Sequence, residues 1–280
     1  MPNACDLDPA RLLPPFESSL PGALRFAGES ALLKFRGLTR EIYSTERFLS
    51  DSRERISGVW KTIPVNGGRM LLSGGGGPEL MRYSANHGLK LAGDADASRA
   101  ARLIGTALND VIASYPFLRS ALSELVWCCH IVLPQGDDYD VSFSDPAIPF
   151  SIFVSAPVLA DQSSVLRVAE SLIHETLHLQ LTLFEGLVPL VDAASTWSMY
   201  SPWKQQERPA QGVLHGLYVF CVLRWMWRQI SRTTRSTNSR DFALRRIAEI
   251  DEEVDSVRAI EGSPSLTEAG RRFLGGLFVR

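Results

Sequence analysis

The chain has 280 residues, of which 45% are hydrophobic and 21% charged, as is usual for a soluble globular protein with one substantial core or two small ones. A formal net charge of -2 and a pI near 6.2, without a basic stripe, argue against binding nucleic acid by neutralising phosphates. Charged residues interrupt the longest apolar runs, and the N-terminal residues lack the basic start and apolar core of a secretion signal. We therefore expect a cytoplasmic protein that does not bind membranes.

The first 140 residues show mainly helical patterns. Residues 1–30 hold five prolines and little periodicity, which predicts an extended arm. The apolar spacing over 30–60 predicts one long or two consecutive amphipathic helices. Four successive glycines at 74–77 lack the lysine and serine or threonine of a phosphate loop and predict a flexible connection. Residues 97–125 again have helical spacing, so we expect residues 1–140 to be a helical N-terminal region where a peptide-recognition groove would lie.

Two short apolar segments predict strands. Residues 125–133, stopped by a proline, and residues 150–155 are rich in bulky apolar side chains. We expect the two strands to pair close to the helix that follows, because only a short loop separates the second strand from it. His130 lies within the first strand, where a structural role is favoured over metal ligation.

The next helix carries the main motif of the chain. Apolar residues nearly surround the segment 165–184, which predicts a buried helix that stops at Gly186. Within it lies His174-Glu175-Thr-Leu-His178, the His-Glu-x-x-His pattern, whose two imidazoles can converge on one metal ion with the glutamate beside it. Burying these three groups together is unfavourable unless a partner satisfies them, and a metal is the simplest partner. The alternative is a pair of hydrogen-bonded core histidines, with the glutamate paired to an arginine.

The C-terminal part is predicted to be helical after one irregular stretch. Residues 195–209 are crowded with aromatic side chains, as the loop of a substrate or cosubstrate pocket would be. A second helix is expected from 209 to about 232, starting at a proline. Residues 232–240 are polar and predict a solvated loop, and two last helices are expected over 241–261 and 265–276.

Together these elements predict an α+β protein that is predominantly helical. The buried HExxH helix and a second histidine-bearing helix would lie beside a small sheet. We expect residues 141–280 to form the metal-binding catalytic region, continuous with the N-terminal region in one globular unit.

Two imidazoles do not hold a catalytic metal alone, so a third ligand is needed. The extended zinc-peptidase pattern is excluded, because Leu181 and Phe184 stand where it requires a glycine and a histidine. His215 is the favoured candidate, since it lies inside the second helix between two glycines that would let another backbone approach. Glu207 is the alternative carboxylate ligand, and a core role for the histidine is the other alternative.

These residues resemble a known family, the HExxH-type peptide β-hydroxylases. These are iron(II)- and 2-oxoglutarate-dependent enzymes found with the precursors of ribosomally made, post-translationally modified peptides. The resemblance covers residues 145–225. The segments that carry it, in the same order as in the family, are Pro149–Ser155, Glu170–His178, Tyr200–Trp203, Arg208–Pro209 and Gly212–Phe220.

The resemblance implies a site and a reaction. His174, His178 and His215 would hold the iron, with Glu175 beside it, and 2-oxoglutarate would chelate the metal through its keto acid end. The implied reaction couples oxidative decarboxylation of 2-oxoglutarate to hydroxylation of a β-carbon in a precursor peptide. The oxidative chemistry follows from the resemblance alone.

The far carboxylate of 2-oxoglutarate would need a cation, and a guanidinium can form two parallel hydrogen bonds with it. Arg208 is the candidate because, if the second helix extends back to it, it lies seven residues before His215 on the same face. The other candidates for binding the cosubstrate are Lys204 and Arg82 as cations and Trp203 and Tyr218 as aromatic contacts.

Two other functions are compatible with the motif. In a zinc metallopeptidase, Glu175 would be the general base for a water molecule, and Glu207 or His215 would complete the site. In a peptide-binding or recruitment protein, the metal would be structural or absent and the aromatic residues of 197–203 would bind the peptide. The sequence indicates neither the peptide nor the oligomeric state.

Overall fold

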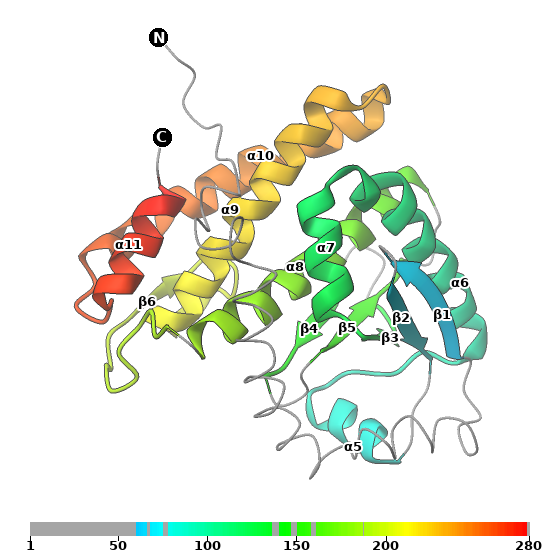
Figure 1. The fold of residues 1–280 in the computed structure, drawn as a ribbon, viewed down its shortest axis with the longest axis horizontal. Helices are drawn as coiled ribbons and strands as arrows, with labels where there is room; N and C mark the ends of the chain where they lie inside the picture. Colours follow the sequence, from blue (N-terminus) through cyan, green and yellow to red (C-terminus); the bar gives the residue numbers. More distant parts are fainter. Residues whose placement is uncertain are drawn as a thin grey trace. The chain divides into compact units, whose positions relative to one another are not determined.

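The computed structural model describes residues 60–278, apart from 66–67, 75–77, 136–139, 147–149, 158–160 and 187 (Figure 1). The fold is α+β and predominantly helical, as predicted. The described residues up to Gln180 form one compact unit, here called the sheet unit, and those from Leu181 on form a second, the helical unit. The arm and helices predicted before residue 60 lie outside the described residues.

The sheet unit is built on five strands in the order β1-β2-β3-β5-β4 (Figure 1). Strands β2, β3 and β5 are parallel, whereas β1 and β4 pair antiparallel at the two ends. Every residue of β3 and β5 is buried, as is typical of parallel strands covered on both faces. The strand bounds are Trp60–Val65 for β1, Gly68–Ser73 for β2, Cys128–Val132 for β3, Ser142–Ser144 for β4 and Ser151–Ser155 for β5.

The sheet confirms one prediction and corrects two. The predicted pair of strands at 125–133 and 150–155 is present as β3 and β5. The predicted boundary between 140 and 141 lies inside the sheet unit, because strands on both sides of it pair with each other. Strands β1 and β2 were not predicted, since a helical N-terminal region was expected. Of the glycine run predicted to be a flexible connection, Gly74 is tightly packed, with a Cβ there 2.2 Å from the Cβ of Ala97, and residues 75–77 lie outside the described residues.

Short helices link the strands of the sheet unit. The predicted helix over 97–125 is interrupted in its middle by a π-helical and a 3-10 turn. Pro116 then starts a new helix, because proline has no N–H to continue the helical hydrogen bonds and suits the first helical turn. The bounds are Pro78–Asn86 for α5, Asp94–Thr106 for α6, Ala107–Val111 for the π-helix η1, Ile112–Ser114 for the 3-10 helix η2 and Pro116–Leu125 for α7.

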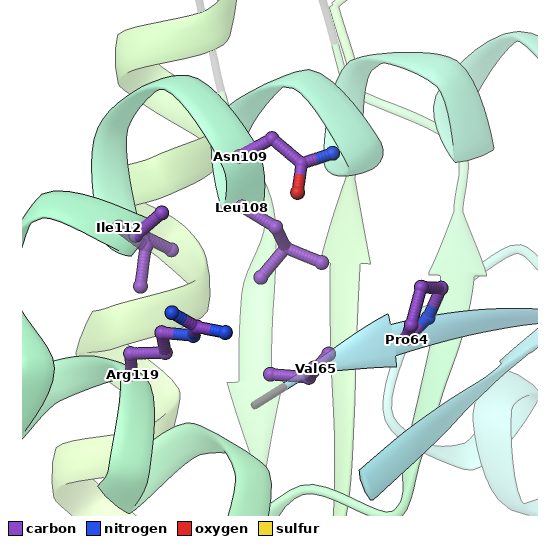
Figure 2. Close-up of a pocket in the computed structure, with 7 residues that line it drawn as sticks. Pro64, Val65, Leu108, Asn109, Ile112 and Arg119 are labelled. Atoms are coloured by element: carbon purple, nitrogen blue, oxygen red, sulfur yellow. The ribbon is translucent and has the colours of Figure 1, made fainter. Parts of the chain in front are cut away.

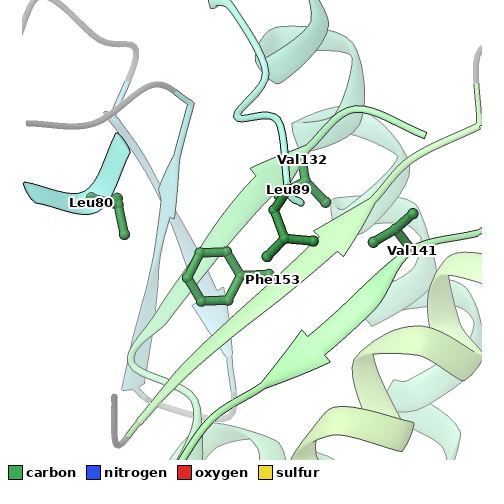
Figure 3. Close-up of a cluster of buried hydrophobic side chains, with 5 residues drawn as sticks. All are labelled: Leu80, Leu89, Val132, Val141 and Phe153. Carbon is green, nitrogen blue, oxygen red and sulfur yellow. The ribbon is translucent and has the colours of Figure 1, made fainter. Parts of the chain in front are cut away.

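An apolar cluster covers one face of the sheet (Figure 3). Phe153 of β5 is fully buried at its centre, Leu80 reaches it from α5, and Phe143 of β4 packs against it. The remaining members of the cluster are Leu89, Val132 and Val141. On the other face, two hydroxyls of β4 donate hydrogen bonds to the long helix α8, described below.

Helix α8 spans Gln162–Glu185 and agrees closely with the predicted helix over 165–184. Asp161 precedes it, and its carboxylate accepts hydrogen bonds from the backbone N–H and the hydroxyl of Ser164, each at 2.7 Å. These bonds, with one from the Ser163 hydroxyl, lower the pKa of Asp161 to about 2. The helix ends immediately before Gly186, as predicted.

The helical unit is organised around α9, Ala210–Thr233, which is buried over most of its length. It packs against the hairpin of β6 and β7 and against α10 and α11, and Arg224 of α9 bonds Asp251 of α10 at 2.8 Å. The other bounds are Ser198–Ser201 for β6, Gln206–Pro209 for β7, Thr237–Ser256 for α10, Arg258–Gly262 for the 3-10 helix η3 and Glu268–Leu277 for α11.

Two predictions for the helical unit need correction. The stretch 195–209 is not wholly irregular, because it contains the β6–β7 hairpin. The polar segment 232–240 is mostly helical, since α9 and α10 extend into it and Ser236 caps α10 by accepting from the Ser239 N–H. The two last helices are present as α10 and α11. None of the described helices has the length and apolar character needed to cross a bilayer.

Candidate metal centre

The two histidines of the HExxH motif converge, as the sequence predicted. The Nε2 atoms of His174 and His178 are 3.2 Å apart, and the two rings meet edge to face with centroids 4.8 Å apart. Two nitrogens bound at about 2.1 Å to one ion, at roughly 90–110°, would be about 3.0–3.4 Å apart. The imidazole pair therefore has the separation that two ligands of one metal ion require.

Glu175, between the two histidines, is 3% exposed. Its Oε1 accepts a hydrogen bond from the Ser142 hydroxyl and its Oε2 one from the Ser144 hydroxyl, both at 2.6 Å. Oε1 also lies 3.9 Å from Nε2 of His174. The expected alternative of an arginine partner for Glu175 is wrong, because two serine hydroxyls satisfy this buried carboxylate.

Alternation along β4 explains how both serines reach α8. Asp140, Ser142 and Ser144 lie two residues apart, so their side chains emerge on the same side of the extended chain. Arg167 of α8, eight residues before Glu175, bonds Asp140 through Nε at 2.6 Å and through Nη2 at 3.0 Å. The intervening Val141 and Phe143 pack in the apolar cluster on the opposite face. Strand β4 therefore holds α8 on one side and contributes to the core on the other.

His130, for which the sequence favoured a structural role, lies in the core of the sheet unit. It is 1% exposed, its ring lies 4.7 Å from that of Phe153, and its Nδ1 is 3.8 Å from Sγ of Cys128. Burial lowers the pKa of His130 to about 4, so the ring is neutral near pH 7. This environment agrees with the structural role favoured from the sequence.

His215 is located in α9 of the helical unit, where a carboxylate accompanies it. Its Nε2 lies 2.7 Å from Oε2 of Glu185, and the same oxygen accepts a hydrogen bond from Nε2 of Gln211 at 2.9 Å. The side chains of His215 and Glu185 are 15% and 10% exposed. If His215 binds a metal while this contact persists, Nδ1 would be the ligand and Glu185 would orient the ring, as carboxylates do for many metal-binding histidines.

Arg208 does not lie on the helix of His215, so the spacing argument for it fails. It belongs to β7, and Pro209 is the N-cap of α9. The Arg208 guanidinium instead crosses the first turn of α9, where a Cβ on Gly212 would lie 3.1 Å from Nε. Among the described residues, this half-buried side chain has no hydrogen bond or ion pair. Arg208 therefore remains a candidate cation for a carboxylate, although it lies in β7 and not on the helix of His215 as expected.

Trp203 occupies the space left by the second glycine of α9. A Cβ on Gly216 would lie 2.4 Å from the indole, which stacks on Phe220 with an interplanar angle of 7° and donates from Nε1 to Glu253 at 2.9 Å. The two glycines beside His215 thus accommodate an arginine and a tryptophan side chain, where the sequence suggested a second backbone.

The four remaining candidates lie on different elements of the two units. Tyr218 is 1% exposed and packs against Phe273, and burial raises its pKa well above the usual value. Glu207 is exposed and accepts a hydrogen bond from Ser198 at 3.3 Å. Lys204 is exposed in the turn between β6 and β7, and Arg82 is exposed on α5.

Ser142 and Ser144 are the site residues that the sequence did not indicate. The polar-apolar-polar alternation of Ser142–Ser144 is a strand signal, but three residues are too few to distinguish it from a loop. In the part of the chain that the structure describes, no group of three or more histidine, cysteine, aspartate or glutamate side chains could hold a metal ion. Comparison with models of known families gave no match, and no curated protein matched the chain.

Proposed function

We propose that the protein is an iron(II)- and 2-oxoglutarate-dependent oxygenase that hydroxylates the β-carbon of a residue in a ribosomally made precursor peptide. The observation that supports this most is the imidazole pair of His174 and His178, whose Nε2 atoms are 3.2 Å apart beside a buried carboxylate. The order of motifs between residues 145 and 225 supports the choice of an oxygenase over other metal-dependent enzymes.

In this proposal His174 and His178 bind the iron, and His215 remains the predicted third ligand. Bound iron(II), together with 2-oxoglutarate and molecular oxygen, would supply the oxidant for a C–H bond. The far carboxylate of 2-oxoglutarate would pair with a guanidinium, for which Arg208 remains the candidate. The residues of the chain itself would then have to bind and orient the substrates and exclude water from the site.

The role of Glu175 separates the oxygenase from a zinc metallopeptidase. A general base must direct one carboxylate oxygen at the water molecule whose proton it takes. Both oxygens of Glu175 already accept hydrogen bonds from serine hydroxyls at 2.6 Å. This arrangement favours a fixed carboxylate that orients a neighbouring group, and we assign Glu175 that role.

The proposal is tested by titrating the purified metal-free protein with iron(II) and then 2-oxoglutarate without oxygen. Chelation of iron(II) by the keto acid should produce a visible metal-to-ligand charge-transfer band. The band should be absent in His215→Ala if that residue is the third ligand. Circular dichroism of the variant should show the helix content of the parent, so that loss of the band is not loss of the fold.

Two results would overturn parts of the proposal. Tight binding of zinc without the band, together with cleavage of a peptide, would replace the oxygenase by a metallopeptidase. A band that persists in a folded His215→Ala variant would keep the oxygenase but remove His215 from the ligand set. A peptide screen for mass increases of one oxygen atom, with and without 2-oxoglutarate, would then identify the substrate.

A further inference from the structure

A cavity of about 220 Å³ lies in the sheet unit at the end of β1, beneath η1, η2 and the first turn of α7 (Figure 2). Val65, Leu108 and Ile112 line it with buried apolar side chains, and Ala113 adds a methyl group. The cavity shares none of its lining residues with the HExxH site or its serines.

The polar groups of the cavity come from two side chains. Asn109 is exposed at the rim next to Leu108, and Arg119 of α7 directs its guanidinium towards Val65 and Leu108 (Figure 2). Arg119 is half-buried, and its side chain has no hydrogen bond or ion pair with the residues that the structure describes. A guanidinium above an apolar wall without a carboxylate partner is a group suited to binding an anion.

The backbone also departs from regular geometry at this cavity. Ala107–Val111 is π-helical and Ile112–Ser114 is 3-10, so the two irregular turns together supply Leu108, Asn109, Ile112 and Ala113 to the lining. Single π-helical turns are rare and frequently occur at functional sites. The irregular geometry and a guanidinium that has no partner among the described residues therefore coincide at one cavity.

We propose that this cavity binds a small carboxylate that bears a short branched apolar body. The carboxylate would pair with Arg119, and the body would lie against Val65, Leu108 and Ile112. The volume is below that of pockets for drug-sized ligands, so the body is no larger than a single amino-acid side chain. Such a group could come from a free organic acid or from the C-terminal residue of a peptide, and binding needs neither iron nor 2-oxoglutarate.

The test uses the full chain without added metal and 4-methylpentanoate as the probe, with binding followed by NMR chemical shifts. The neutral isostere 4-methylpentanamide removes the charge, and acetate removes the apolar body. We expect Arg119→Gln to weaken binding of 4-methylpentanoate by about tenfold or more, because a charge-assisted hydrogen bond is lost. The matched control is Arg102→Gln, an exposed arginine on α6 that does not line the cavity and should leave affinity unchanged.

A second variant and a second ligand pair sharpen the test. Ala113→Leu adds three carbons to the wall, so it should reduce binding of 4-methylpentanoate while leaving Arg119 in place. The peptide Gly-Gly-Leu is tested with a free C-terminus and in its amidated form, which lacks the carboxylate. Tighter binding of the free peptide than of 4-methylpentanoate would indicate the C-terminal residue of a peptide as the natural ligand. Tighter binding of 4-methylpentanoate would indicate a free organic acid. Equal binding of 4-methylpentanoate and its amide, unchanged affinity in Arg119→Gln, or binding of neither the free acid nor the free peptide would overturn the proposal.

Discussion

The two longest helices, α8 and α9, both carry histidines, but the imidazoles have different partners. In α8, the Nε2 atoms of His174 and His178 face each other at 3.2 Å. In α9, Nε2 of His215 faces a carboxylate oxygen of Glu185 at 2.7 Å. An imidazole and a carboxylate satisfy each other, whereas two facing imidazoles can share one proton or one cation but cannot both be protonated without repulsion. This difference is the reason we propose the α8 pair, and not His215 alone, as the centre of a metal site.

The largest expected effect tests the α8 pair directly. His174→Ala or His178→Ala removes a proposed metal ligand, so iron(II) affinity should fall by more than the roughly 100-fold that loss of an outer-shell partner costs. A chelator competition titration measures the change. His87→Ala is the matched control, because His87 is a partly exposed histidine of the same unit outside the motif. If iron affinity were unchanged in both motif variants, the α8 pair would have a structural role and would not be the proposed metal site.

A smaller effect is expected when Glu175 is replaced. Glu175→Gln keeps the shape but replaces one accepting oxygen by an amide that donates towards a serine hydroxyl, so turnover of 2-oxoglutarate should fall by about 10- to 100-fold. Iron affinity should be retained, as measured by the same competition titration. Ser142→Ala and Ser144→Ala each remove one hydrogen-bond donor to Glu175. Each should also lower turnover of 2-oxoglutarate, but by a smaller factor. Complete loss of bound metal in Glu175→Gln would make the carboxylate itself a ligand.

His130 provides a third histidine environment, in which burial alone acts. Its pKa of about 4 lies below the unfolded value near 6.5, so the unfolded chain binds the proton first as pH falls. Stability is therefore lost between pH 6.5 and pH 4, and His130 should account for about 2 kcal/mol of the decrease in unfolding free energy from pH 7 to pH 5. Urea denaturation at pH 7 and pH 5 measures this decrease. In His130→Phe the decrease in unfolding free energy should be smaller by about 2 kcal/mol. An identical loss in the variant would mean that His130 titrates normally.

The smallest effect concerns the carboxylate of α9. Glu185→Gln weakens a charge-assisted hydrogen bond to His215 but leaves an acceptor, so the unfolding free energy should fall by about 1 kcal/mol. Glu207→Gln is the control, because this exposed carboxylate makes only a 3.3 Å contact with Ser198 and should change stability little. If Glu185→Gln also weakened iron binding by about tenfold or more, Glu185 would be orienting a metal ligand. The histidines of α8 and α9 would then both bind the metal.

Local signals explain why the helices were predictable. Asp161 and Gly186 mark the two ends of α8, and Pro209 marks the start of α9, because each of these residues acts on the backbone at its own position. The convergence of His174 and His178 also follows from helix periodicity alone. These parts of the structure depend on neighbours within one or two turns.

The missed parts depend on distant partners. Strands β1 and β2 contain or adjoin glycines, and only their pairing in the five-stranded sheet identifies them. The hydrogen bonds of Ser142 and Ser144 to Glu175 join residues more than 30 positions apart. The helical position proposed for Arg208 was wrong because Pro209 starts α9 and the preceding residues form a hairpin with β6. Tertiary contacts of this kind leave no periodic trace in the sequence.

The three-residue strand β4 gives the site a dependence on strand register. Ser142 pairs with Val154 and Ser144 with Ile152 of β5. A slip of one residue would exchange the two faces and turn Phe143 towards Glu175, leaving a buried carboxylate without its hydroxyl donors. The carboxylate would then lose its fixed orientation without any substitution in the HExxH motif. The chemistry of the motif is thus set in part by the alignment of two neighbouring strands.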